Sequence, residues 1–341
     1  MNLLIKDESS QYYKTGFSCD NAIVLSFGEE HLFITDSRYT LEAAESVNDR
    51  TEVIEASDLV KTARQLIRKA GLRSLVYDPK EWHSSDFKKL SEKLHKVNLK
   101  AKEGFLASMR AIKTDEEIAL LKTAAEIGAD AFDRFAIFLN ENGHTYTEKN
   151  LFFKAMEVLT CQGERPVSFE PILAVNANAA KPHALPTDDA LKKGDLLLMD
   201  AGIKHERYCS DRTRTVQFDS AFNFTRQQHF KNPKIQKVYD LVLKAHDEAI
   251  RLAKPGMKAS ELDAVARSII EAGGYGERFI HSLGHGVGLD IHEHPYINKR
   301  NDVVLEENMV FTIEPGIYLP GEFGIRIEDT VVLKSDGAHI L

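Results

Sequence analysis

The chain has 341 residues, more than a single hydrophobic core usually supports, so two domains are expected. Its formal net charge is -8 and no basic cluster is interleaved with aromatic residues, which argues against nucleic acid and anionic membranes as partners. Three widely spaced cysteines argue against a disulfide framework. Neither a long apolar run nor a leader-like N-terminus is present, so a cytoplasmic protein is expected.

Residues 1–105 alternate short strand and helix patterns. Two apolar runs, 22–27 and 31–35, flank a glycine-containing turn and predict a β-hairpin. A further strand is predicted at 74–77, and helices are predicted at about 38–46, 58–70 and 84–95. This alternation predicts a smaller α/β domain over 1–105, and no motif in it carries chemistry.

A second domain, 108–341, is expected after a short linker near Gly104. Thr114 and Glu117 form a capping box, which predicts a helix that ends near Gly143. Further helices are predicted at 147–163, 233–254 and 260–272. Helix pairs that alternate with hairpins are typical of an internally duplicated α+β domain.

The first of these hairpins carries two aspartates. Four apolar residues lead into Asp200, and a segment rich in Thr and Val leads away from Asp211. If the turn lies at 204–207, the two carboxylates face each other at about 5 Å and repel unless a cation lies between them. The alternative is a register that differs by one residue, which would place the carboxylates on opposite faces.

A glycine-rich segment with four histidines follows the last predicted helix. Glycines at 284, 286 and 288 disfavour a helix, so a loop or a bulged strand is predicted around His281 and His285. Exposed histidines in a flexible loop are the alternative, but that would not explain four within fourteen residues. The spacing also fails the glycine pattern of a nucleotide-binding loop.

The acidic hairpin recurs near the C-terminus. Segments 309–318 and 324–332 flank a turn, and Gly321 lies midway between Glu314 and Glu328. A second facing pair of carboxylates is therefore expected. Two hairpins that each present such a pair make a coincidence of surface charges the weaker explanation.

The donor set consists of four carboxylates and one imidazole, without a thiolate. Such ligands favour Mn²⁺, Co²⁺, Fe²⁺ or Zn²⁺ over a structural zinc site of the cysteine type. Four negative charges exceed what one divalent ion balances, so two metal ions about 3.5 to 4 Å apart are expected, with Mn²⁺ as the first choice. Such a pair supplies hydroxide near neutral pH.

These residues also carry a family resemblance. The settings D-A-G, S-D-R-T-R-T, G-H-G-V-G, E-P-G-I-Y and G-I-R-I-E-D contain, in order, Asp200, Asp211, His285, Glu314 and Glu328. In these motifs the chain resembles the pita-bread metallopeptidases, which include aminopeptidase P, prolidase and methionine aminopeptidase. The resemblance implies an α+β pita-bread catalytic domain, preceded by a smaller α/β creatinase-like domain.

The resemblance implies a role for each of the five metal ligands. Asp200 would bind one metal ion, and His285 and Glu314 would bind the other. Asp211 and Glu328 would bridge the two ions. Glu314 is also a catalytic candidate, because a carboxyl at that position can pass a proton to the leaving group.

Four more residues match substrate-site positions of the family. His183 and His292 match two histidines that line the substrate site and are catalytic candidates. His281 matches a further pocket histidine, and Arg326 matches an arginine of the proline-handling members, so both are substrate-binding candidates. Taken alone, each of these histidines would more often be structural.

The N-terminal domain, His281 and Arg326 favour the proline-specific branch of the family. The expected activity is an X-Pro aminopeptidase acting on short peptides with proline second. An X-Pro dipeptidase stays open, since the sequence does not show whether the pocket is blocked beyond the second residue. A non-catalytic binding module is a further alternative, but it would be expected to lose ligand residues. A homodimer is expected from the family.

Overall fold

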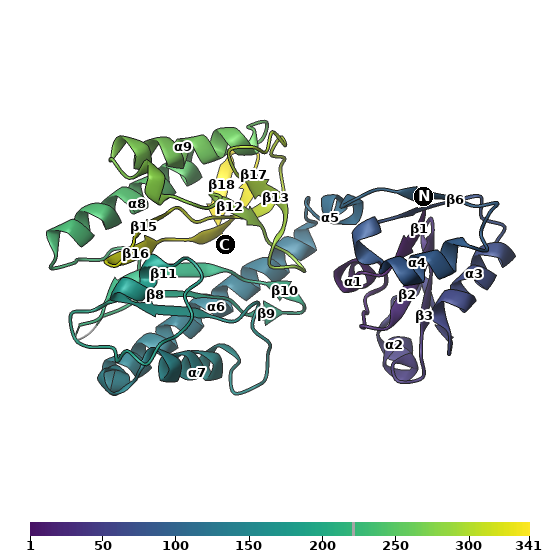
Figure 1. Ribbon diagram of the computed structural model, residues 1–341, viewed down its shortest axis with the longest axis horizontal. Helices are drawn as coiled ribbons and strands as arrows, with labels where there is room; N and C mark the ends of the chain where they lie inside the picture. The colour runs from purple at the N-terminus through teal and green to yellow at the C-terminus, as the bar shows by residue number, and fades with distance from the viewer. Residues whose placement is uncertain (220–221) are drawn as a thin grey trace. The chain divides into compact units, whose positions relative to one another are not determined.

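In the computed structural model, which describes residues 1–219 and 222–341, the chain divides into two compact units, Met1–Arg110 and Ala111–Leu341 (Figure 1). The N-terminal unit contains a six-stranded sheet of order β4-β3-β2-β1-β5-β6. Its strands are β1 (Asn2–Ile5), β2 (Ala22–Phe27), β3 (Glu30–Thr35), β4 (Thr51–Glu55), β5 (Ser74–Tyr77) and β6 (Asn98–Ala101). Its helices are α1 (Glu8–Thr15), α2 (Thr40–Ser46), α3 (Leu59–Lys69), α4 (Ser84–Ser91) and α5 (Phe105–Met109), with the 3-10 turn η1 (Pro79–Glu81).

The predicted α/β character of this unit is confirmed, and its predicted hairpin is β2–β3. Three strands were not predicted. β1 is only four residues long, yet it lies centrally, pairing antiparallel with β2 and parallel with β5. β4 and β6 are sheet edges whose side chains are partly exposed, so their polar residues hide the strand pattern.

The C-terminal unit repeats one arrangement, a pair of helices packed on a sheet. Its helices are α6 (Asp115–Asn142), α7 (Glu148–Leu159), α8 (Pro233–Leu252) and α9 (Ala259–Ala272), with the 3-10 turns η2 (Gly143–Thr145), η3 (Asn176–Ala180) and η4 (Gly276–Arg278). Its strands are β7 (Ile172–Val175), β8 (Leu196–Ala201), β9 (Lys204–His205), β10 (Tyr208–Cys209), β11 (Arg212–Gln217), β12 (Gly284–Gly286), β13 (Glu293–Ile297), β14 (Val310–Ile313), β15 (Gly316–Leu319), β16 (Phe323–Arg326), β17 (Asp329–Lys334) and β18 (Gly337–Ile340).

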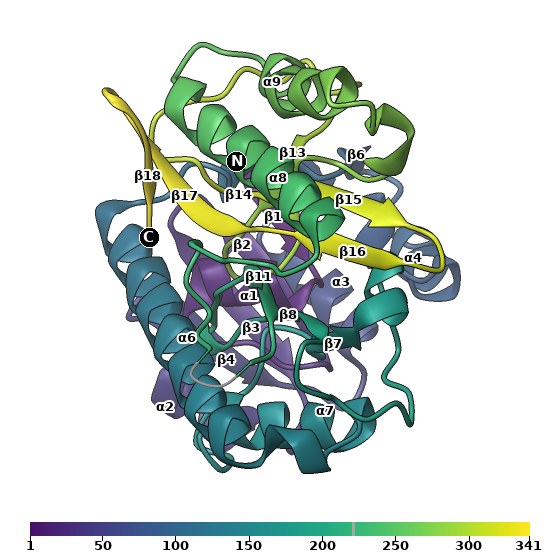
Figure 2. The same ribbon diagram turned by 90° about the vertical axis from the view of Figure 1, so that its left-hand side faces the viewer.

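Helices α6 and α7 lie on one side of these strands and α8 and α9 on the other (Figures 1 and 2). The predicted caps are present: Thr114 and Glu117 form the capping box of α6, and Thr147 caps α7. Within the described ranges, no helix is both long enough and apolar enough to cross a bilayer.

Strand β8 lies between two hydrophobic cores. Leu197 and Met199 pack with side chains from α6 and α7, whereas Leu196 and Leu198 pack in the core that contains α8 and α9. Side chains alternate along a strand, which explains why four consecutive apolar residues precede Asp200. Asp200 therefore lies on the same face of β8 as Leu196 and Leu198, the face that packs toward α8 and α9.

The predicted register of the first hairpin is wrong by two residues. Asp200 lies opposite Thr213 rather than Asp211. The turn is centred on Glu206 and Arg207, whose φ angles of 47° and 73° suit a two-residue hairpin turn. A shift by an even number keeps both aspartates on one face, where they become diagonal neighbours.

The register predicted for the second hairpin is confirmed. Gly316 pairs with Arg326, and Ile313 pairs with Asp329. Both pairings have the same midpoint, so Glu314 and Glu328 fall opposite each other where one ladder ends and the next begins. The predicted bulged strand is also present, because the register of β12 against β13 shifts after His285.

Gly202 allows the first hairpin to close next to the two aspartates. A Cβ atom at this position would lie 1.8 Å from the backbone oxygen of Ser210. Changing Gly202 to Ala is therefore expected to lower the free energy of unfolding by about 3 kcal/mol, as overpacking against rigid backbone does. Urea unfolding measures this loss. Gly276→Ala is the matched control, since its nearest contact is the side chain of Glu271 at 3.1 Å. Equal stability of the two variants would contradict the tight approach.

Candidate metal centre and substrate pocket

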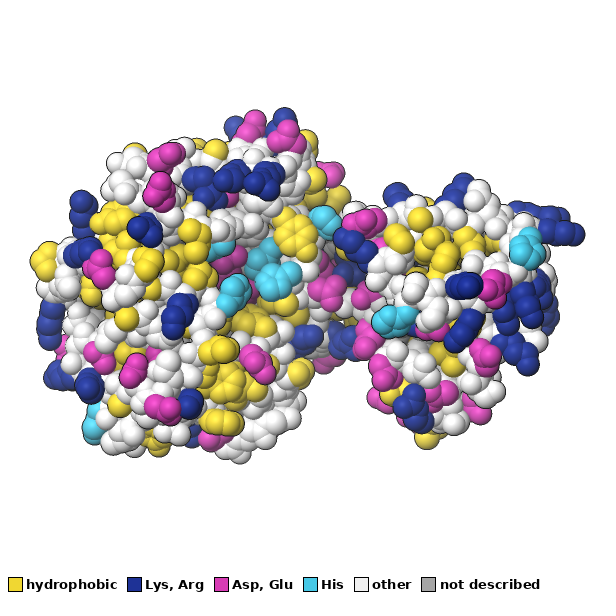
Figure 3. Space-filling view, in the orientation of Figure 1, with side chains coloured by type: hydrophobic (Ala, Val, Ile, Leu, Met, Phe, Trp, Pro, Cys, Tyr) yellow, Lys and Arg dark blue, Asp and Glu magenta, His cyan; other side chains and the backbone are white. Residues whose placement is uncertain are grey.

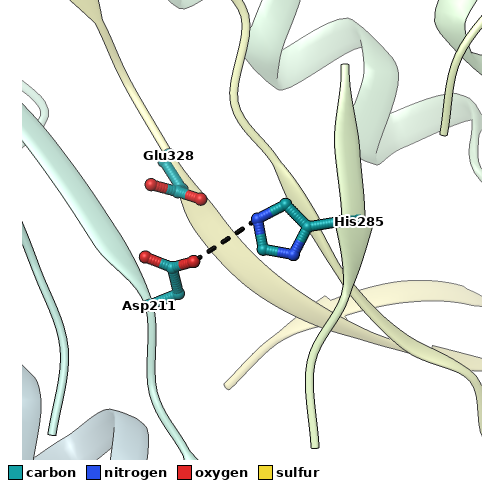
Figure 4. Close-up of side chains that lie close together, drawn as sticks. All are labelled: Asp211, His285 and Glu328. Atoms are coloured by element: carbon teal, nitrogen blue, oxygen red, sulfur yellow. Dashed lines mark ion pairs between the residues drawn. The ribbon is translucent and has the colours of Figure 1, made fainter. Parts of the chain in front are cut away.

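Three side chains from separate segments of the C-terminal unit converge (Figure 4). Asp211 follows β10, His285 lies in β12, and Glu328 lies between β16 and β17. Their ligand atoms all lie within 4.8 Å of one another, and Nε2 of His285 is 3.5 Å from Oδ2 of Asp211. One imidazole and two carboxylates at this spacing are a suitable start for a divalent metal site.

Glu314 and Asp200 complete the predicted set of five. Oε1 of Glu314 lies 3.5 Å from Nε2 of His285. Asp200 ends the apolar run of β8, and all five residues line one cavity of about 610 Å³. The structure thus brings the five side chains together. Their roles as metal ligands stay predictions.

The His285 ring is held in the orientation that a metal ligand requires. Its Nδ1 donates a hydrogen bond of 3.1 Å to the carbonyl oxygen of Gly286, which leaves the lone pair of Nε2 facing the carboxylates. Burial, followed by the nearby His292, lowers the pKa of His285 to about 4. The imidazole is therefore neutral near pH 7.

The carboxylates crowd one another in a buried space. Burial, and next the neighbouring Glu328, raise the pKa values of Asp211 and Glu314 well above their ordinary range. Burial, and next Asp200, raise the pKa of Glu328 to about 8. Without a cation, burial and mutual repulsion favour the protonated forms of these carboxyl groups, and a divalent ion would displace protons from them.

Asp200 supplies an independent test of whether the site fits a cation. Its Oδ2 accepts a hydrogen bond of 2.6 Å from Nη2 of Arg326. Its Oδ1 is buried and has no hydrogen-bond partner among the described residues. A buried carboxylate oxygen without a donor is costly, and a metal ion would satisfy it. The donor chemistry thus fits divalent ions.

Arg326, a predicted substrate-binding residue, lines the cavity, and four neighbours hold its guanidinium, among them the carbonyl oxygen of Pro182 at 3.4 Å. Besides Asp200, its guanidinium donates to Oγ1 of Thr213 at 3.1 Å and to the Tyr318 hydroxyl at 2.7 Å. Thr213 in turn donates a 2.6 Å hydrogen bond to Oε2 of Glu328. Arg326 therefore orients the carboxylates of both hairpins, and its substrate-binding role stays a prediction.

His281 belongs to the same network. Its Nδ1 donates to the carbonyl oxygen of Ser282 at 2.7 Å, so Nε2 can accept the hydrogen bond of 2.9 Å from the Tyr318 hydroxyl. Burial, and next the charge of Arg326, lower the pKa of His281 to about 3. A neutral His281 thus faces the cavity with a fixed ring.

His183 and His292 line the cavity and are exposed to solvent. The ring centroid of His292 lies 4.3 Å from that of His285. Figure 3 shows several histidine side chains gathered beside acidic groups in a hollow of this unit. Both residues are therefore placed where a substrate could reach them.

The remaining wall of the cavity is largely apolar. Its larger apolar members are Phe152, Phe169, Ile172, Leu185, Pro186 and Ile291. Sequence reasoning did not identify this wall, nor Thr213 and Tyr318. The two hydrogen-bonding residues do lie inside the motifs S-D-R-T-R-T and E-P-G-I-Y, which is the signal that could have found them.

The raised pKa values predict how the metal-free protein responds to pH. A carboxyl group whose pKa is raised on folding stabilises the protein at low pH, and that contribution disappears as pH rises through the folded pKa. The pKa of Glu328 is raised from 4.5 to about 8, so the window runs from about pH 5 to pH 8. The free energy of unfolding is expected to fall by on the order of 3 kcal/mol across it.

Thermal unfolding of chelator-treated protein at several pH values measures this fall. Protein loaded with Mn²⁺ is the control, because metal binding replaces the protons and removes the loss. If the metal-free protein were equally stable at pH 5 and pH 8, the crowded carboxylates would not be protonated as described.

Comparison with known proteins agrees with this geometry. Residues 119–335 match metallopeptidase family M24, and residues 2–112 match the creatinase/prolidase N-terminal domain. The chain belongs to metallopeptidase family M24. Family membership confirms the resemblance and the fold class predicted from the motifs, and makes this M24 protein a metal-dependent peptidase.

Several relatives of this M24 chain are similar over most of its length. An uncharacterised peptidase of Bacillus subtilis is 31% identical over 335 residues, covering 98% of this chain and 91% of the relative. The Xaa-Pro dipeptidase of Pyrococcus furiosus is 41% identical over 250 residues, covering 73% of this chain and 68% of the relative.

The solved X-Pro aminopeptidase of Thermotoga maritima superposes with a TM-score of 0.88 at 34% identity, covering 99% of this chain and 94% of that one. The Xaa-Pro dipeptidase of Bacillus anthracis superposes with a TM-score of 0.89 at 31% identity, covering 99% and 92%.

Proposed function

We propose that this M24 chain is an exopeptidase that cleaves the bond between an N-terminal residue and a proline in second position. The observation that carries the proposal is one cavity that combines the four predicted carboxylate ligands and His285 with an apolar wall. The relatives named Xaa-Pro dipeptidase and X-Pro aminopeptidase support this specificity.

Two divalent ions are proposed for the centre, with Mn²⁺ first and Co²⁺, Zn²⁺ or Fe²⁺ as alternatives. Asp200 would hold one ion, His285 and Glu314 the other, and Asp211 and Glu328 both. When bound, such ions act as Lewis acids and lower the pKa of water toward neutrality.

Residues of the chain would orient the substrate and move the proton. His183 and His292 can donate hydrogen bonds to the substrate carbonyl as charge develops on its oxygen. Glu314, whose pKa burial raises, is the candidate to accept a proton and return it to the leaving nitrogen. The apolar wall suits a pyrrolidine ring, because an imide bond before proline has no N–H to satisfy.

Two activities within this class are candidates. Relatives favour the Xaa-Pro dipeptidase, a name carried by the proteins of Pyrococcus furiosus and Pyrococcus horikoshii. The cavity gives one reason for the X-Pro aminopeptidase predicted from the sequence. Among the described residues that line the cavity, Arg326 is the only Lys or Arg. Its guanidinium already donates a hydrogen bond to Asp200. The C-terminal carboxylate of an X-Pro dipeptide belongs to the proline itself. A cationic side chain without another partner would favour binding of that carboxylate.

Hydrolysis of Ala-Pro and Ala-Pro-Ala by Mn²⁺-loaded protein tests the proposal, with Ala-Ala as control. Cleavage of either proline peptide, with Ala-Ala a poor substrate, is expected. A higher kcat/KM for the dipeptide would identify the dipeptidase, and a higher value for the tripeptide would identify the aminopeptidase. Metal-loaded protein that cleaves neither would refute the proposal and favour the binding module on the same fold.

We also propose that 108–341 carries the chemistry and that the chain forms a homodimer. A cytoplasmic location is proposed because Cys19, Cys161 and Cys209 are all free thiols. Light scattering coupled to size-exclusion chromatography tests the dimer, and a monomer at micromolar concentration would contradict it.

A further inference from the structure

A buried ion pair outside the cavity joins the start of α6 to the segment that carries His292. Nζ of Lys113 lies 2.5 Å from Oε1 of Glu293, and both side chains are 1% exposed. Neither residue belongs to the cavity lining. Moving two charges out of water costs free energy that their attraction only partly returns, so such a pair is poorly explained by stability alone.

Glu293 is tied directly to the segment that forms the metal centre. It is the first residue of β13 and pairs with Gly286, the neighbour of His285. His292 lies in the bend that immediately precedes β13, is exposed and lines the cavity, whereas the side chain of Glu293 is buried. Because the two residues are adjacent, a fixed Glu293 carboxylate also fixes the orientation of His292.

The Glu293 carboxylate also lies against the backbone of the turn before His292. A Cβ atom on Gly288 would meet Oε1 of Glu293 at 2.3 Å. The carbonyl oxygen of Gly288 accepts a 2.8 Å hydrogen bond from the backbone N–H of Cys209, two residues before Asp211. The ion pair therefore packs against a turn that leads to His292 and is hydrogen-bonded to the segment that leads to Asp211.

Lys113 approaches this turn from a fixed position. Its backbone N–H donates to the carbonyl oxygen of Asn308 at 2.9 Å, and it directly precedes Thr114, the N-cap of α6. In the same first turn, Glu117 accepts a 2.9 Å hydrogen bond from the Tyr208 hydroxyl. The start of α6 thus holds the segments that lead to His292 and to Asp211.

We propose that Lys113 and Glu293 are positioning residues for His292. The inference rests on the proposed peptidase activity and on the proposed contact of His292 with the substrate carbonyl. Neutralising either partner releases the turn, so His292 no longer meets the reacting carbonyl in alignment. A misplacement of about 1 Å can cost on the order of 100-fold in rate, so kcat is expected to fall by about 10- to 100-fold with little change in KM.

A double-mutant cycle tests this coupling with Glu293→Gln, His292→Ala and the doubly substituted protein, all loaded with Mn²⁺ and assayed on Ala-Pro-Ala and Ala-Pro. Glu293→Gln is expected to lower kcat at least about tenfold alone, and less than about threefold when His292 is already Ala. Equal fractional losses in both backgrounds would overturn the inference, because a purely structural role acts independently of His292. No loss in either background would also overturn it.

A second variant separates alignment from folding. Lys113→Met combined with Glu293→Gln replaces the pair by neutral groups of similar volume, so the fold is expected to survive with a near-wild-type Tm. Its kcat is expected to stay low, and wild-type kcat in this variant would overturn the inference. Wild-type protein that cleaves neither peptide would refute the proposed function, whereas cleavage with a fully active Glu293→Gln variant would refute only the positioning role.

Discussion

Replacing Asp211 with Asn is expected to lower kcat/KM on proline peptides by at least about 1,000-fold. The change removes one negative charge and one oxygen donor but preserves the shape of the side chain. Burial, and next Glu328, raise the pKa of Asp211 well above its ordinary range, which favours the neutral carboxyl when no metal ion is bound. Asn resembles that neutral form, so the metal-free variant should be nearly as stable as the metal-free wild type.

The loss should therefore appear in the response to metal rather than in the fold. Adding Mn²⁺ at 100 times its Kd stabilises a protein that binds it by about 2.7 kcal/mol, and the variant should lose most of that gain. Peptide assays and thermal unfolding with and without Mn²⁺ measure both effects. Glu307→Gln, a change at an exposed carboxylate, is the matched control and should behave as wild type. An active Asp211→Asn variant that still gains stability from Mn²⁺ would show that Asp211 is not a ligand.

Replacing Arg326 with Met is expected to lower the free energy of unfolding of the metal-free protein by about 3 kcal/mol or more, because it removes one partner of a buried ion pair. The Arg326 side chain is 4% exposed, and its guanidinium contacts Asp200, Thr213 and Tyr318. Asp200 would be left buried and uncompensated. A bound metal ion would supply positive charge to the same carboxylate, so Mn²⁺ should restore part of the loss.

Urea unfolding with and without Mn²⁺ measures this difference. Arg300→Met is the control, since Arg300 is exposed and its substitution should change stability by no more than about 0.5 kcal/mol. An equal loss with and without Mn²⁺ would contradict the view that Arg326 and the metal compensate the same carboxylate.

The second acidic hairpin could be predicted to the residue because its register depends on one short turn at Gly321. The first could not, because the position of a two-residue turn at Glu206 and Arg207 is not determined by the apolar pattern on either side. An even error preserved the face, so the convergence of Asp200 and Asp211 was still predicted. The five candidate ligands were thus accessible from motif and period alone.

The buried ion pairs around the site could not be predicted from the sequence. Arg326 and Asp200 are 126 positions apart, and Lys113 and Glu293 are 180 apart. Lys113 and Glu293, each read alone, predict ordinary exposed charges, since isolated charges are almost never fully buried. Only the folded chain places such distant partners against each other. The short edge strands β4 and β6 were not predicted either, because their pairing with β3 and β5, rather than their own sequence pattern, defines them.

Equilibrium dialysis against Mn²⁺, with metal bound per chain measured for wild type and Asp211→Asn, tests the central claim most directly. If the five side chains form one dinuclear centre, wild type takes up two equivalents and the variant fewer. Equal uptake by the two proteins, or none by either, would contradict the account.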